Sequence, residues 1–217
     1  MSAPEVLMEG VVFGESPRWH DGRLWFSDWG ANQVIALDAD GSHEVVVTVP
    51  SFPMCIDFLS DGRLLVVDSA RQRLLRREPD GSLVVHADLS EVSEKPWNDI
   101  VVDDRGNAYV NTIGFDFPGG EFAPGLVVLV TPEGNVAQVA EDLAFPNGMA
   151  ITPDGATLVV CEAEAEIVRL IFCWYNDSMS PRAIANRLNA THVPTYAGPV
   201  SRTTGWRGWS PASIITV

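Results

Sequence analysis

Dipeptides of the Asp-Gly type recur along this chain at nearly regular intervals, and this repeat restricts its fold more than any other feature. The first series comprises Asp21-Gly22, Asp61-Gly62, Arg105-Gly106 and Asp154-Gly155. Its members are 40, 44 and 49 residues apart. The second series comprises Asp40-Gly41, Asp80-Gly81 and Glu133-Gly134, which trail the first by 19, 19 and 28 residues. The longest interval contains a Gly/Pro-rich insertion at Phe115–Gly125. Such spacing indicates an internal repeat of one supersecondary unit.

Short runs rich in Val, Ile, Leu and aromatic residues lie between these turns, which is typical of β-hairpins. The runs are Leu24–Asp28, Gln33–Asp38, Glu44–Val49, Leu64–Asp68, Arg73–Arg77, Leu83–His86, Ile100–Val102, Asn107–Asn111, Leu126–Thr131, Met149–Thr152 and Thr157–Cys161. Two hairpin turns per repeat predict a four-stranded meander, the blade of a β-propeller. A β-sandwich is the alternative, but it would not place the same two turns at the same phase of each repeat. We therefore predict an all-β propeller of about 3.5–4 blades, the fourth being incomplete.

The last 49 residues differ from the rest in charge. Residues 1–168 carry nine basic and 28 acidic side chains, whereas residues 169–217 carry five basic side chains and one acid, Asp177. Such a shift indicates a boundary. We predict a partial propeller over 1–168 and a divergent or poorly ordered tail over 169–217. The tail is either a divergent end of the same domain or a segment foreign to the fold, such as an out-of-frame terminus.

The overall charge excludes several classes of partner. A net charge of −15 disfavours nucleic acid and anionic membrane surfaces.

The apolar runs are too short to span a bilayer, and the first ten residues lack the basic and apolar regions of a secretory signal. Three cysteines without metal-type spacing fit buried thiols in a reducing compartment. We therefore expect a cytoplasmic protein.

One position of the repeat carries candidate ligands. Six or seven residues before the first-series turns lie Glu15, Cys55, Asn98 and Asn147. In a propeller the innermost strand of each blade lines the central channel, so residues at one phase meet around the axis. A carboxylate and two amide carbonyls are the hard oxygen ligands that Ca²⁺ prefers.

Each of these residues also has an ordinary explanation. Asn147 precedes Gly148, which is a turn signal by itself. Asn98, followed by Asp99, could cap the entry of a strand, and an isolated Glu15 is usually a solvated side chain. Position alone leaves a metal or polar ligand site and these local roles both open.

Three motifs give the chain a family resemblance. Gly14–Trp19 (GESPRW), Trp97–Asp103 (WNDIVVD) and Phe145–Ala150 (FPNGMA) resemble, in the same order, the senescence marker protein/gluconolactonase/luciferin-regenerating enzyme family. The resemblance covers about residues 9–162. It implies a six-bladed propeller that holds one divalent metal at its axis, usually Ca²⁺ and sometimes Zn²⁺. It also implies the hydrolysis of small-molecule lactones, sugar lactones among them.

The resemblance also implies roles for single residues. Glu15 and Asn147 match metal ligands of the family, while Asn98 and Glu121 match substrate-binding positions. An Arg that regucalcin-like members carry two residues before the first Asn is Pro96 here. The family's third metal ligand, an Asp in a Pro-Asp-Gly context that also serves as general base, has no match after Gly155.

These observations support three hypotheses about function. The chain is a metal-dependent lactonase, a non-catalytic propeller that binds a ligand or partner on its axial face, or an inactive truncated family member. An incomplete ring would leave blade edges open, through which copies of the chain could associate.

Overall fold

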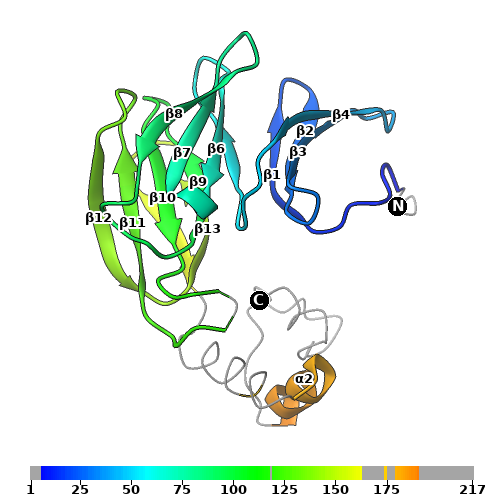
Figure 1. The fold of residues 1–217 in the computed structure, drawn as a ribbon, viewed down its shortest axis with the longest axis vertical. Helices are drawn as coiled ribbons and strands as arrows, with labels where there is room; N and C mark the ends of the chain where they lie inside the picture. Colours follow the sequence, from blue (N-terminus) through cyan, green and yellow to red (C-terminus); the bar gives the residue numbers. More distant parts are fainter. Residues whose placement is uncertain (1–5, 118, 163–173, 175–178, 191–217) are drawn as a thin grey trace. The chain divides into compact units, whose positions relative to one another are not determined.

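The computed structural model of this protein describes residues 6–117, 119–162, 174 and 179–190. The chain divides into two compact units, Met1–Ala163 and Glu164–Val217, and each is described by itself. The first unit consists of antiparallel sheets whose strands follow one another in chain order (Figure 1). This architecture confirms the prediction of an all-β chain built from four-stranded, blade-like sheets.

Three sheets have four strands each, and a fourth has two among the described residues. The first contains β1 (Gly14–His20), β2 (Arg23–Asp28), β3 (Gln33–Leu37) and β4 (His43–Thr48). The second contains β5 (Ile56–Phe58), β6 (Leu64–Asp68), β7 (Arg73–Arg77) and β8 (Leu83–Asp88). The third contains β9 (Trp97–Val102), β10 (Ala108–Thr112), β11 (Gly125–Val130) and β12 (Val136–Leu143). The fourth contains β13 (Pro146–Ile151) and β14 (Leu158–Glu162).

The hydrophobic core lies between neighbouring sheets. One continuous cluster includes Val34 of the first sheet, Leu65 and Leu74 of the second, and Ile100 and Val128 of the third, all nearly inaccessible to solvent. The first strands of successive sheets, β1, β5, β9 and β13, contact one another in that order. Each sheet thus buries its faces against its neighbours, as propeller blades do.

The fourth sheet is much more exposed than its counterparts. All five residues of β6 are buried, whereas none of the five residues of β14 is, and Val159 is 49% exposed. Strand β13 contacts β9 and β10 on one side. Among the described residues, the fourth sheet packs against the third sheet alone, which agrees with the exposure of β14.

The first strands of three sheets begin earlier than the sequence predicts. Strand β1 was not among the predicted runs, β9 begins at Trp97 instead of Ile100, and β13 begins at Pro146 instead of Met149. The pairing register of each strand shifts by one residue close to its start. Such β-bulges break the alternation of apolar and polar residues that identifies a strand in a sequence.

The second unit contains a helix that the sequence analysis did not anticipate. Helix α2 (Pro181–Ala190) begins after Ser180, whose hydroxyl and carbonyl oxygens accept hydrogen bonds from the backbone of Ala183. Ile184 and Leu188 of this helix are buried. The guanidinium of Arg187 lies 4.4 Å from the ring centre of Trp174. Most of the predicted tail lies outside the described residues.

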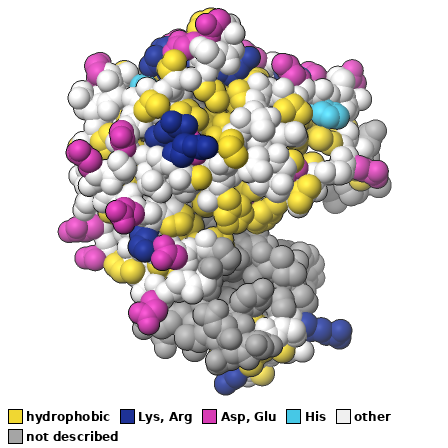
Figure 2. All heavy atoms as spheres, viewed as in Figure 1, with side chains coloured by type: hydrophobic (Ala, Val, Ile, Leu, Met, Phe, Trp, Pro, Cys, Tyr) yellow, Lys and Arg dark blue, Asp and Glu magenta, His cyan; other side chains and the backbone are white. Residues whose placement is uncertain are grey.

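The distribution of surface side chains and the lengths of the helices bear on the partners expected from the sequence. In the view of Figure 2, acidic side chains are scattered along the edge of the first unit, while hydrophobic ones gather nearer its middle. In the part of the chain that the structure describes, no helix is long and apolar enough to cross a membrane.

The carboxylate of Asp28 fastens the segment before β1 to the end of β2. It accepts hydrogen bonds from the backbone N–H groups of Val12 (2.9 Å), Phe13 (3.0 Å), Gly30 (3.0 Å) and Ala31 (3.2 Å). Burial acts to raise the pKa of Asp28, but the four donors more than offset it and hold the pKa below its usual value. The ionised carboxylate is therefore the form that the folded protein favours.

We predict that Asp28→Ala lowers the free energy of unfolding by about 2–4 kcal/mol, because four buried or partly buried donors lose their acceptor. Urea denaturation at pH 7 measures this, with the exposed Asp104→Ala as the matched control. Because the folded-state pKa is lowered, the contribution of Asp28 is complete above its unfolded-state pKa and is lost as pH falls through the folded-state value. The difference in the free energy of unfolding between the wild type and Asp28→Ala should therefore become smaller in strong acid. A deficit no larger than that of Asp104→Ala would contradict the assignment.

Candidate functional site

The predicted ligands lie at or next to β-bulges in the first strands of three sheets. In each bulge, two residues of the first strand stand opposite one residue of the second strand. The opposing sets are Ser16-Pro17 and Phe26, Asn98-Asp99 and Asn111, and Asn147-Gly148 and Cys161. Glu15 directly precedes the first bulge. A bulge turns a side chain away from the regular alternation and frees backbone groups from the ladder.

Two of the predicted residues meet directly. The side-chain amide of Asn98 donates to Oδ1 of Asn147 over 3.3 Å and lies 3.5 Å from the carbonyl oxygen of Pro146. These residues come from different sheets and are 49 positions apart in the chain. The structure therefore brings the bulges of β9 and β13 together, as the repeat phase predicts for strands around a common axis.

Glu15 is half-buried in β1, and within the described residues no hydrogen bond joins it to Asn98 or Asn147. Burial is the main cause that raises its pKa, and the negative charge of Asp99 adds to it, while a backbone hydrogen bond from Ser16 acts in the opposite direction. Asp99 in turn accepts a hydrogen bond of 3.1 Å from the backbone N–H of Met149, two residues after Asn147. Electrostatic coupling to Asp99 thus connects Glu15 with the strand that carries Asn147.

The fourth residue at this phase, Cys55, is buried and has no ligand character. Burial raises the pKa of its thiol well above the usual value, and the charges of Asp99 and Glu15 add to the increase. Next to it, the hydroxyl of Ser16 accepts a hydrogen bond of 2.9 Å from the backbone N–H of Ile56 and lies 3.2 Å from its carbonyl oxygen. The bulge of β1 is therefore bound to β5 by a side chain instead of by strand pairing.

The sequence analysis missed a charged cluster beside this site. The guanidinium of Arg18 in β1 lies 3.5 Å from Asp57 of β5 and 3.4 Å from Asp99 of β9, and it donates to the carbonyl oxygen of Ile100 over 2.6 Å. Burial raises the pKa of both carboxyl groups, and the positive charge of Arg18 counteracts it. One arginine thus joins the first strands of three sheets. No spacing in the sequence singles it out, because its partners occupy different phases of the repeat.

One further sequence-based candidate, Glu121, is not hydrogen-bonded to this group. Glu121 is exposed in the connection between β10 and β11. Within the described residues, it makes no hydrogen bond or ion pair with Glu15, Asn98 or Asn147. Asp177, which the sequence analysis left without a role, lies outside the described residues.

The donor atoms fit a hard divalent cation in kind. Glu15 supplies a carboxylate, and Asn98 and Asn147 supply amide oxygens, which are the ligand types of Ca²⁺ sites. Burial and the negative charge of Asp99 raise the pKa of Glu15, and a cation bound beside this carboxylate would act in the opposite direction. Over residues 6–117, 119–162, 174 and 179–190, however, no group of three or more His, Cys, Asp or Glu side chains converges. The described residues thus offer one anionic ligand and two neutral ones.

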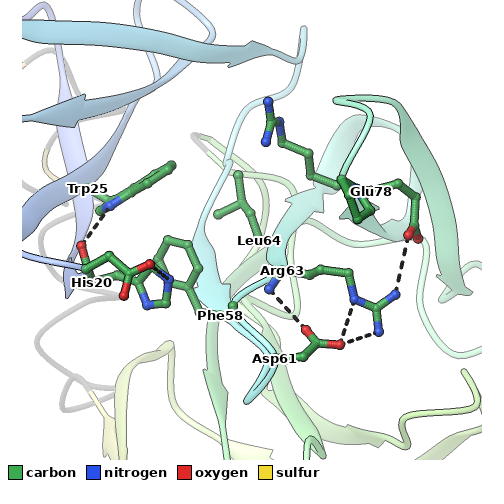
Figure 3. A pocket seen from close by; sticks show the side chains of 11 residues that line it. His20, Trp25, Phe58, Asp61, Arg63, Leu64 and Glu78 are labelled. Carbon is green, nitrogen blue, oxygen red and sulfur yellow. Dashed lines mark hydrogen bonds and ion pairs between the residues drawn. The ribbon is translucent and has the colours of Figure 1, made fainter.

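A separate cavity lies at the opposite end of β1. It has a volume of about 310 Å³ and is lined by residues of the first two sheets, among them Trp25 and Phe58 (Figure 3). His20 stacks on Phe58 at 3.7 Å between ring centres. Arg63 is paired with Asp61 at 2.6 Å and with Glu78 at 3.4 Å. Charged side chains that line this cavity therefore pair with one another. The cavity lies at the His20 end of β1, whereas Glu15 lies near the other end of the strand.

Comparison with known proteins supports the fold. The family model described as "SMP-30/Gluconolactonase/LRE-like region" matches residues 13–189, and one described as "Recombinase" matches residues 162–217. Diisopropyl-fluorophosphatase of Loligo vulgaris is 25% identical over 190 residues, which are 77% of this chain and 58% of that protein.

Two solved structures share the fold. A gluconolactonase from Xanthomonas campestris matches with a TM-score of 0.60 and 24% identity, over 72% of this chain and 57% of that one. A calcium-binding protein, regucalcin, from Agrobacterium tumefaciens matches with a TM-score of 0.61 and 23% identity, over 74% of this chain and 54% of that one. The chain thus spans somewhat more than half the length of these relatives.

We predict that Arg18→Met lowers the free energy of unfolding by about 2–4 kcal/mol, because two buried carboxylates lose their compensating charge. Chemical denaturation at pH 7 provides the measurement, and Arg105→Met, in an exposed turn, provides the matched control. Adding Asp99→Asn should restore part of the loss, since one of the uncompensated charges is then removed. Equal effects of the two arginine substitutions would show that the cluster does not depend on Arg18.

Proposed function

Since this chain belongs to the SMP-30/gluconolactonase/LRE-like family, we propose that it is a metal-dependent hydrolase that opens lactones at the bulges of its first strands. The observation that carries the proposal is the 3.3 Å contact between the side chains of Asn98 and Asn147. It joins two amides of the same repeat phase from different sheets, and the charge of Asp99 contributes to the raised pKa of Glu15. The names of the relatives, a gluconolactonase and a fluorophosphatase, support a hydrolase.

In this proposal, Glu15 and Asn147 hold the metal, and Asn98 binds the substrate. We propose Ca²⁺ as the metal because all the side-chain donors are oxygens and because a relative is named a calcium-binding protein. When bound, the cation supplies Lewis-acid chemistry, polarising a carbonyl and lowering the pKa of water. Asn98 has a side-chain amide that can donate to a lactone oxygen once it is released from Asn147. Glu121, from the β10–β11 connection, is proposed as a further substrate contact.

Asp99 is not proposed as the general base. One of its oxygens accepts a hydrogen bond from the backbone of Met149, and the other faces Arg18 at 3.4 Å. Both oxygens of Asp99 are thus engaged by protein groups. We assign no base among the described residues.

A second candidate, a propeller that binds a ligand at the same site without catalysis, is favoured by this engagement of Asp99. Such a protein would bind the cation and a lactone or its acid without turning the lactone over. The two candidates share the binding residues and differ only in whether a proton acceptor completes the site.

We further propose that residues 169–217 form a segment distinct from the propeller. The reversal of charge at this point and the separate family match over residues 162–217 support this division. A cytoplasmic location remains a proposal from the sequence.

The proposal predicts that gluconolactone opening by the purified chain requires added Ca²⁺ or Zn²⁺ and is abolished by a chelator. Glu15→Ala should reduce the rate at least about tenfold, since even the loss of an indirect metal partner typically has such an effect. Base titration at constant pH measures the acid released, and the exposed Glu91→Ala is the matched control.

Calorimetric titration with Ca²⁺ separates the two candidate functions. Metal binding that is lost in Glu15→Ala, without turnover in the wild type, would support the binding protein. A lactone-opening rate that is unchanged in Glu15→Ala would overturn the assignment of this site.

A further inference from the structure

A single buried amide connects the bulges of the third and fourth sheets. Asn111 lies in β10, opposite the bulge formed by Asn98 and Asp99, and is fully inaccessible to solvent. Its Oδ1 accepts a hydrogen bond of 3.0 Å from the backbone N–H of Asp99. Its Nδ2 donates one of 2.7 Å to the backbone carbonyl of Asn147. One side chain thus completes the hydrogen bonding of both bulges.

We propose that Asn111 is a positioning residue that sets the distance and orientation between Asn98 and Asn147. Among the described residues, its side chain makes no hydrogen bond with either of theirs. It fixes the two backbones from which these side chains project, and so the placement of the amide oxygens. This inference rests on the proposed function for its consequence, the binding of a cation, but the structural connection can be measured separately.

The chemistry of the position explains why an amide is required. A bulge leaves backbone groups without ladder partners, and a buried group without a partner costs about 1–3 kcal/mol. The N–H of Asp99 needs an acceptor, and the carbonyl of Asn147 needs a donor. An asparagine side chain offers both on neighbouring atoms, whereas aspartate offers acceptors only and leucine offers neither.

The other two bulges lack such a residue. Phe26 stands opposite the bulge of β1, and Cys161 stands opposite the bulge of β13. Neither side chain can act as a good donor and a good acceptor at once. The connection through Asn111 is therefore not a general property of the repeat. It is specific to the place where the two candidate amides meet.

Asp99 provides a second connection between the same strands, through the backbone N–H of Met149. Together the two bonds hold β13 on either side of Gly148. This matters because the outer part of the fourth sheet is exposed and contributes little packing of its own. Without Asn111, β13 would keep the bond from Met149 to Asp99 and the contacts with the Asn98 side chain, but the backbone carbonyl of Asn147 would lose its donor.

The test compares Asn111→Leu with Thr112→Val in the full chain. Both substitutions keep the number and branching of side-chain heavy atoms and remove hydrogen bonds from β10, but Thr112 bonds to Pro96, which directly precedes β9, and not to β13. Amide hydrogen exchange is followed in Pro146–Ile151 and, as an internal reference, in Gly14–His20. We expect exchange over 146–151 to accelerate at least about tenfold in Asn111→Leu, with no more than about a twofold change in Thr112→Val.

Calorimetric titration with Ca²⁺ provides the functional readout. We expect affinity to fall about tenfold or more in Asn111→Leu and to change less than about twofold in Thr112→Val, as for the loss of a second partner of a metal ligand. If the wild type binds no Ca²⁺, the proposed function fails, while hydrogen exchange still decides the role of Asn111.

Asn111→Asp keeps the test decisive if Asn111→Leu does not fold. It retains the acceptor for Asp99 and loses only the donor to Asn147, so exchange should again accelerate over 146–151. The proposal would be overturned if amides over 146–151 exchanged as slowly in the folded Asn111 variant as in the wild type. It would also be overturned if Thr112→Val accelerated exchange there to the same extent.

Discussion

Every first strand that carries a candidate ligand interrupts its own ladder of hydrogen bonds, and the side chains that replace the lost bonds come largely from other strands. Ser16 bonds to the backbone of Ile56, Asp99 to that of Met149, and Asn111 to those of Asp99 and Asn147. Because buried backbone groups must be paired, these bonds are as necessary as the ladder itself. The same contacts that join one sheet to the next therefore also place the site.

Several carboxyl groups around the bulges are buried and share one arginine. Three carboxyl groups, those of Glu15, Asp57 and Asp99, have pKa values raised mainly by burial. Among the described residues, Arg18 pairs with Asp57 and Asp99, and Glu15 forms no ion pair. Both oxygens of Asp99 are engaged, one by Arg18 and the other by the backbone N–H of Met149.

The repeat of turns was enough to predict the sheets, because Asp-Gly turns and alternating strands are local signals. Phase within the repeat also grouped Glu15, Asn98 and Asn147, since it reflects position around an axis. The bulges could not be predicted in this way: they remove the alternation that marks a strand, so β1 and the start of β9 went unrecognised. Arg18 and Asn111 were missed for another reason, because their partners lie at other phases and only the packing of sheets brings them together.

The uneven burial of the fourth sheet means that the first unit is not equally resistant to opening throughout. Strands β6 and β10 lie within the continuous core, whereas the interactions of β14 with other described residues are mainly its pairing with β13 and the bond of 2.7 Å that Glu162 accepts from the backbone of Ala144. Regions with few buried contacts open at lower free energy than the global transition. Asn147 lies between the continuous core and the exposed hairpin of β13 and β14. Local opening of this hairpin would therefore separate Asn98 and Asn147 before the other sheets opened.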